Sequence, residues 1–214
     1  MSAPLSGRRA QAARNDGLIV EAAREVFVAD PTAPIAAVAE RAGVGISALY
    51  RRYPSKEDLL RKLCADGLAL YTAIVEKAVD AITSGGDPWE VFATFMRDVV
   101  AADTHSITNA LAGTFTPSPE LYEMSARAGK LNDELLARTH RAGVIRADLE
   151  IGDLGALFGQ LASVGVGDPA RVADLRQRYL TIILDGLRVP PVTTDLPSHA
   201  PTLEERAGQW TPRS

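Results

Sequence analysis

Residues 35–53, IAAVAERAGVGISALYRRY, decide the fold of this chain. The first half repeats its apolar residues at the spacing of one helical face: Ile35, Val38, Ala39 and Ala42. Gly43 follows, where a chain leaving a helix turns left-handed. In the second half Leu49 can face inward with Ile46 and Tyr53. Two short helices joined by a glycine turn, with arginines on the second, are typical of a helix-turn-helix that reads the major groove of DNA. The alternative is an ordinary helical hairpin with a solvated basic face.

The charge is unevenly distributed around this segment. The chain has 214 residues, 46% of them hydrophobic, which is enough for one large or two modest domains. Its net charge of −4 excludes a protein that coats nucleic acid with its whole surface. Residues 1–63 hold 10 Lys and Arg against 7 Asp and Glu, a net charge of +3, which leaves −7 for residues 64–214. This indicates a local contact with an anionic partner.

Other classes are excluded by what the chain lacks. No apolar run approaches the roughly 20 residues of a membrane span, and the arginines of the first 16 residues precede no signal-peptide core. We expect a cytoplasmic protein with no membrane partner. The single cysteine, Cys64, excludes a disulfide framework, and its apolar neighbours indicate a packed thiol rather than a reactive one. We expect no metal and no cofactor.

Apolar residues repeat at three and four throughout, which predicts an all-α fold. We expect helix one to begin near Asn15 or Asp16 and to end at Ala29. Pro34 suits the first turn of helix two, and Ser55 with Asp58 forms a capping box that starts a long helix toward Ile82. Pairs of a capping residue and proline at 87–88, 118–119 and 168–169 each open a further helix, and the rest of the chain is expected to form helical segments near 88–102, 104–113, 119–142, 150–166 and 169–188.

With this order in view, the chain resembles the TetR family of bacterial transcriptional regulators over about residues 12–62. The resemblance rests on Leu18, Ala22, Ala23 and Phe27, on VAERAGV at 38–44, and on LYRRYPSKEDLL at 49–60. Two later segments, RAGVIRADL (141–149) and YLTIILDGL (179–187), resemble an actinobacterial branch of that family. The resemblance implies that an inducer binds the C-terminal domain and moves the helix at 55–82, changing the separation of two reading heads.

We therefore divide the chain into four parts. A flexible basic arm precedes a three-helix DNA-binding domain with the helix-turn-helix, then a larger helical ligand-binding and dimerisation domain, and a mostly irregular tail whose Leu203, Arg206 and Trp210 are candidates to dock on the body. The ranges are 1–14, 15–54, 55–189 and 190–214.

Departures from the family pattern redistribute the expected DNA contacts. Pro34 stands where the family often has a Thr that touches a phosphate, and Gly45, Ser47 and Ala48 replace a frequent Ser, Gly and Thr. Arg52 replaces the commoner His and adds a permanent charge. The lost hydroxyls shift the contacts toward the arginines, the tyrosines and the arm.

Phosphate contacts fix position, whereas contacts to base edges carry sequence information. We expect Ile46, Ser47, Ala48 and Arg51 or Arg52 to face the groove. The expected phosphate contacts are Lys56 at the start of its helix, Tyr50 or Tyr53, and Arg8, Arg9 and Arg14 of the arm. For Lys56 and the arm arginines, the alternative is a solvated charge.

One short reading helix makes few contacts, so two copies should bind half-sites of a palindromic operator as a homodimer. The candidate interface residues lie on two apolar helices: Leu154, Leu157, Phe158, Leu161, Leu175, Tyr179, Ile182 and Ile183. The alternative is that these helices belong to the interior of one chain.

Residues 89–124 are rich in aromatic, sulfur and small polar groups, as ligand pockets are. The candidate ligand-binding residues are Trp89, Phe92, Met96, His105, Asn109, Phe115 and Tyr122. The alternative is that the aromatic residues are core and the histidine is a hydrogen-bonded one.

The sequence thus favours a regulator, most simply a repressor, that binds double-stranded DNA and is released by a small-molecule inducer. The alternative is a small-molecule-binding helical protein whose DNA-reading head is weakened. An enzyme is excluded because no HExxH, GxSxG, GxGxxG or P-loop motif is present.

Overall fold

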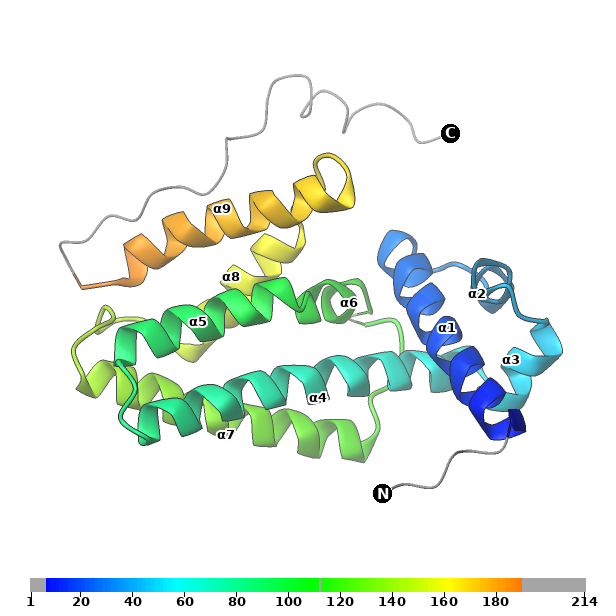
Figure 1. Cartoon of the computed structure of the whole chain (residues 1–214), viewed down its shortest axis with the longest axis horizontal. Coiled ribbons are helices and arrows are strands. Elements are labelled where there is room, and N and C mark those ends of the chain that lie inside the picture. The colour runs from blue at the N-terminus through cyan, green and yellow to red at the C-terminus, as the bar shows by residue number, and fades with distance from the viewer. Residues whose placement is uncertain (1–6, 112, 190–214) are drawn as a thin grey trace. The chain divides into compact units, whose positions relative to one another are not determined.

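The computed structural model describes residues 7–111 and 113–189 (Figure 1). The arm residues 1–6 and the tail at 190–214, with its docking candidates Leu203, Arg206 and Trp210, lie outside the described residues. Within the described part the fold is all-α, as predicted. The helices are α1 (Gly7–Ala29), α2 (Ile35–Ala42), α3 (Ile46–Arg52), α4 (Lys56–Thr83), α5 (Pro88–Ala101), α6 (Thr104–Leu111), α7 (Pro119–Arg141), α8 (Ile151–Ala162) and α9 (Pro169–Leu187).

The helix boundaries confirm most of the capping predictions. Asp87 accepts a hydrogen bond from the backbone N–H of Glu90 at 2.9 Å, and Asp168 accepts one from Arg171 at 2.8 Å, each with proline in the first turn. The Ser55 hydroxyl accepts a bond from the Asp58 N–H at 3.1 Å.

The start of the first helix was predicted wrongly. We expected it at Asn15 or Asp16 after a flexible arm, but α1 is already helical at Gly7. Asp16 lies inside the helix with its carboxylate engaged elsewhere, so it does not cap the helix.

The chain divides into two compact units. Of the described residues, unit 1 comprises 7–67, 107–111 and 113–123, and unit 2 comprises 68–106 and 124–189. In unit 1, α1 contacts α2 and α2 contacts α3 around an apolar cluster. The buried members of the cluster include Ile19, Phe27, Val38, Leu49, Leu59, Ile107 and Leu111. Cys64 packs at its edge, where burial raises the pKa of the thiol, so the packed-thiol interpretation is confirmed.

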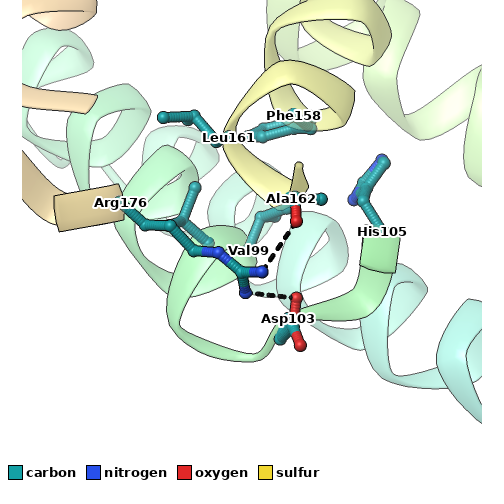
Figure 2. A pocket seen from close by; sticks show the side chains of 8 residues that line it. Val99, Asp103, His105, Phe158, Leu161, Ala162 and Arg176 are labelled. Atoms are coloured by element: carbon teal, nitrogen blue, oxygen red, sulfur yellow. Dashed lines mark hydrogen bonds and ion pairs between the residues drawn. The ribbon is translucent and has the colours of Figure 1, made fainter. Parts of the chain in front are cut away.

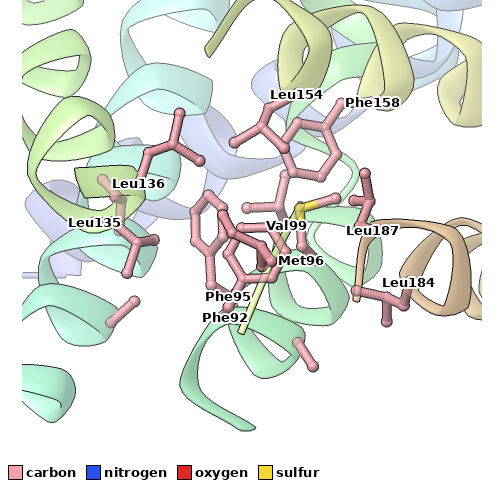
Figure 3. Packing of buried hydrophobic residues seen from close by; sticks show 14 of the residues in the cluster. Phe92, Phe95, Met96, Val99, Leu135, Leu136, Leu154, Phe158, Leu184 and Leu187 are labelled. Atoms are coloured by element: carbon pink, nitrogen blue, oxygen red, sulfur yellow. The ribbon is translucent and has the colours of Figure 1, made fainter. Parts of the chain in front are cut away.

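Unit 2 has its own core. There α5 contacts α8 and α9, which also contact each other. Figure 3 shows this core, which is formed by Phe92, Phe95, Met96, Val99, Leu135, Leu136, Leu154, Phe158, Leu184 and Leu187. The loop after α7 is tied to the end of α9 by an isolated bridge between Ile145 and Arg188. None of the described helices has the length and apolar character that a membrane span requires.

Candidate DNA-binding and ligand-binding sites

The turn between α2 and α3 has the predicted geometry. Gly43 adopts φ 65°, a left-handed conformation that glycine takes without the usual steric cost. The Gly43 N–H donates to the Glu40 carbonyl at 3.1 Å, and the Val44 N–H donates to the Ala39 carbonyl at 3.0 Å. Neither Pro34 before α2 nor Gly45 before α3 provides a side-chain cap. The turn therefore depends on backbone groups and on packing.

Packing sets which face of α3 is exposed. Leu49 and Tyr53 are buried in the core of unit 1, as predicted. Ile46 is 40% exposed, so it does not pack inward with Leu49; this exposure agrees with the groove-facing position also expected for it. The exposed side chains of α3 are Ile46, Ser47, Tyr50, Arg51 and Arg52, with Ala48 half-buried. A short helix with one face free is able to enter a major groove.

Arg52 is exposed but engaged. Its Nε donates to Asp16 Oδ1 at 2.7 Å and its Nη2 donates to Asp16 Oδ2 at 3.1 Å. The Tyr53 hydroxyl also donates to Asp16 Oδ1, at 2.7 Å. The hydrogen bond from Arg52, opposed by partial burial and supported by Tyr53, holds the pKa of Asp16 below its ordinary value. Burial and the bond to Asp16 raise the pKa of Tyr53 well above its ordinary value. The network ties α3 to α1.

Lys56 is engaged as well. Its ammonium donates to the carbonyls of Pro31 and Ala33 at 3.0 and 2.7 Å and lies 4.9 Å from the centre of the Phe27 ring. Lys56 thus ties the start of α4 to the loop between α1 and α2. Its contact with a phosphate stays a prediction, as does that of Arg14, which is exposed on α1.

The predicted ligand set is dispersed. Trp89, Phe92 and Met96 are buried in the core of unit 2, as the core alternative stated. Phe115 is half-buried in unit 1 and Tyr122 is 62% exposed. The Asn109 side chain lies outside the described residues. Of the other members of the set, His105 alone lines the small cavity described next.

That cavity lies within unit 2 and has a volume of about 10 Å³, room for one water molecule (Figure 2). Its lining residues are Val99, Val100, Asp103, His105, Phe158, Leu161, Ala162 and Arg176. The centroids of the His105 and Phe158 rings lie 4.9 Å apart, with the ring planes tilted by 37°. Burial lowers the pKa of His105, although the Asp103 carboxylate opposes this. The neutral imidazole is therefore favoured in the folded chain.

Arg176 crosses the same cavity. It donates to Asp103 Oδ1 and to the Ala162 carbonyl, each at 2.7 Å (Figure 2). It also donates to the Ser106 hydroxyl at 3.2 Å. Its side chain is 13% exposed, and its buried Nε has no hydrogen-bond partner among the described residues. The sequence reasoning missed Arg176. No sequence pattern marked it, because Arg176 stands among the charged and polar residues Asp174, Gln177 and Arg178.

A larger hollow runs between α4 and α5 in unit 2. This open hollow has a volume of about 260 Å³ and lies beside the exposed ion pair of Lys77 and Asp98, in which Nζ and Oδ2 are 3.1 Å apart. No sequence pattern marked it.

Half of the predicted interface residues belong to the interior. Leu154, Phe158, Leu161 and Leu175 are 0–3% exposed within one chain, so the interior alternative holds for them. Figure 3 shows Leu154 and Phe158 in the core of unit 2. Ile182 is 50% exposed, and Leu157, Tyr179 and Ile183 are half-buried. The small residues Gly152, Gly155 and Ala156 are exposed on α8. An interface on these helices therefore has Ile182 and small residues at its surface.

Similarity to known proteins agrees with this geometry. Residues 19–63 match the model of bacterial regulatory proteins of the tetR family, and residues 87–189 match that of the C-terminal domain of SbtR-like transcriptional regulators. A TetR transcription regulatory protein from Mycobacterium vanbaalenii is 32% identical, with 85% of this chain and 99% of that chain covered and a TM-score of 0.52. The chain belongs to the TetR family.

As a TetR-family member, the protein is a DNA-binding transcriptional regulator and not an enzyme. It is 42% identical over 60 residues, 28% of this chain, to the transcriptional repressor LfrR of Mycolicibacterium smegmatis, and the match spans 32% of that repressor's length. The structure of LfrR in complex with proflavine, from Mycobacterium smegmatis, shares the fold at 24% identity, with 79% of this chain and 95% of that chain covered and a TM-score of 0.52.

Proposed function

We propose that this TetR-family protein is a cytoplasmic repressor that binds a palindromic operator as a homodimer and is released by a small molecule bound in unit 2. The observation that carries the proposal is the exposed face of α3, seated on α1 by the buried Leu49 and by the network at Asp16. A rigid reading helix with exposed Arg51 and Tyr50 suits base and phosphate contacts.

The small-molecule part of the proposal rests on unit 2. The cavity at His105 and Arg176 combines an aromatic wall with polar groups, the chemistry of a ligand site, but it has room for one water molecule. A ligand must therefore displace side chains there. A displacement of Ser106 would be transmitted along α6 to unit 1, because that helix continues to Ile107 and Leu111, which are buried in the core of unit 1. α4, with residues in both units, is the second route.

A gel-shift assay with the DNA next to the protein's own gene tests the DNA-binding part. We expect retention of the DNA by the wild-type chain and a loss of about tenfold or more in affinity for Arg51→Ala, since an arginine on a base edge is worth about 1–3 kcal/mol. Retention that is insensitive to salt, or absent, favours the alternative of a ligand-binding protein with a weakened reading head.

Proflavine is the first probe for the ligand part, because it is the molecule bound in the LfrR structure. We expect it to raise the thermal midpoint of unfolding, since a ligand that binds only the folded state stabilises it. We also expect it to release the retained DNA. A rise in midpoint without release would separate binding from regulation.

A further inference from the structure

The two consecutive arginines at the end of α3 differ in their partners. Arg52 forms a two-bond ion pair with Asp16 of α1. Arg51 is exposed and forms no ion pair among the residues that the structure describes. From the sequence the two were interchangeable candidates for reading DNA. The structure separates them.

The geometry around Asp16 resembles that of a phosphate contact. Both carboxylate oxygens accept from one guanidinium, at 2.7 and 3.1 Å, and the same oxygen that accepts from Nε also accepts from the Tyr53 hydroxyl. Arginine binds carboxylates and phosphates with the same fork of parallel N–H donors. An arginine and a tyrosine around one anionic group are also what a DNA phosphate would meet at this helix end. The carboxylate thus takes up the donors that a phosphate would use.

We propose that Asp16 is an internal substitute for a DNA phosphate, which keeps Arg52 as a positioning residue of α3 and leaves Arg51 to contact the DNA. The proposal rests on the DNA binding proposed above for α3. Asp16 is then a specificity-determining residue. Phosphate contacts supply the sequence-independent part of the affinity, so a cation withheld from the phosphates weakens binding to wrong sequences more than it weakens base reading.

Salt dependence of binding to a non-operator duplex measures this directly. The probe is a duplex with the base composition of the promoter fragment and a scrambled sequence. In Asp16→Asn the side chain keeps its shape and loses its charge, so Arg52 is free for a phosphate. We expect the slope of log K against log salt to steepen by about 0.9 for each phosphate gained, or roughly 2 for a dimer with one new contact in each head.

The matched control is Glu21→Gln. Glu21 is exposed on the same helix, five residues from Asp16, and forms no ion pair in the part of the chain that the structure covers. Its change removes the same charge without releasing an arginine. We expect the slope of this variant to match the wild type. Equal slopes for Asp16→Asn and Glu21→Gln overturn the proposal, because the effect would then be one of overall charge or would not exist.

A double variant closes the test. In Asp16→Asn with Arg52→Ala no arginine is released, so the slope should return to the wild-type value; a steep slope that persists overturns the proposal. Arg52→Ala alone should leave the slope unchanged, whereas Arg51→Ala should weaken binding of the promoter fragment, as the loss of a base contact does. A shallower slope in Arg52→Ala assigns Arg52 to a phosphate and also overturns the proposal. If the wild type does not bind its promoter fragment while the slopes differ as expected, the operator proposal fails and the role of Asp16 stands.

Discussion

Arg52, Lys56 and Arg176 show that the partner of a cation decides what it does. From the sequence each is a charge on a helix, and Arg52 and Lys56 were assigned to DNA. In the structure Arg52 meets Asp16, Lys56 meets two loop carbonyls, and Arg176 meets Asp103. These partners come from segments 23 to 73 residues away in the chain. Local periodicity therefore predicted where the cations lie and could not predict their partners.

His105 gives a prediction at the residue scale. Burial beside Phe158 lowers the pKa of the folded imidazole below the ordinary value of 6.5. Below that pH the unfolded chain binds a proton that the folded chain resists. The stability contributed by this group is thus present above pH 6.5 and is lost as the pH falls through the folded pKa.

Urea unfolding of the wild type and of His105→Gln, at about pH 8 and about pH 5, checks this. We expect the wild type to lose more free energy of unfolding on acidification than the variant does. The difference in free energy of unfolding between the two proteins at the higher pH measures the effect of the substitution on packing, and it is subtracted from the difference at the lower pH. Parallel loss in both proteins would contradict the assignment to His105.

At the scale of helices, a terminus was predictable wherever a capping residue and a proline adjacent in the sequence define it. Capping residues before proline placed the starts of α5, α7 and α9. α8 ends at Ala162, short of the expected residue 166, because Ser163 bonds back to Gln160 and Arg176 takes the Ala162 carbonyl. The predicted start of α1 was wrong because of a tertiary contact as well, since the Asp16 carboxylate binds Arg52 and does not cap the helix.

Alanine substitutions at two glycines should change the free energy of unfolding in opposite directions. Gly43 ends α2 at φ 65°, where an L side chain costs about 1–2 kcal/mol, so Gly43→Ala should destabilise unit 1 by that amount. Gly17 lies inside α1 with no atom within 4 Å of an added Cβ. Gly17→Ala should stabilise by about 0.5–1 kcal/mol. Thermal or urea unfolding of both variants measures this, and a shared sign would show that backbone conformation is not the cause.

The ion pair of Asp103 and Arg176 joins the α5–α6 corner to α9. Asp103 adopts φ 49° and Ser106 donates to its carboxylate, so the corner is specified around this pair. Asp103→Asn leaves Arg176, 13% exposed, without its counter-charge. Breaking a buried pair costs about 3–5 kcal/mol, but Asp103 is about one third exposed, so we expect about 1–3 kcal/mol.

Asp98→Asn is the control for that variant. It breaks the ion pair of Asp98, 38% exposed, with Lys77, 72% exposed. We expect the free energy of unfolding to fall by less than about 1 kcal/mol. Urea unfolding at neutral pH compares the two. Equal losses would mean that the pair at Asp103 is no more than a surface contact.

At the scale of the whole molecule, the two units have separate cores but share helices. α4, α6 and α7 each place residues in both units. The apolar periodicity predicted these helices well, because each buries a stripe whichever core receives it. It could not divide inward from outward stripes on α8 and α9, which are apolar on more than one side. This is why Leu154, predicted at an interface, is interior while Ile182 is exposed.

The exposed face of α8 and α9 gives the prediction for the assembled protein. Ile182 is 50% exposed near the end of α9, and α8 exposes small residues that allow close helix approach. If two chains associate there, Ile182→Glu places a charge in an apolar interface and should shift the protein from dimer to monomer.

Leu70→Glu, at an exposed leucine of α4, is the control for this variant and should leave the dimer intact. Sedimentation velocity gives the assembly state, and a gel shift with the promoter fragment should show weakened binding for Ile182→Glu alone, because one reading head makes too few contacts. A dimer that persists in Ile182→Glu would place the interface on another face.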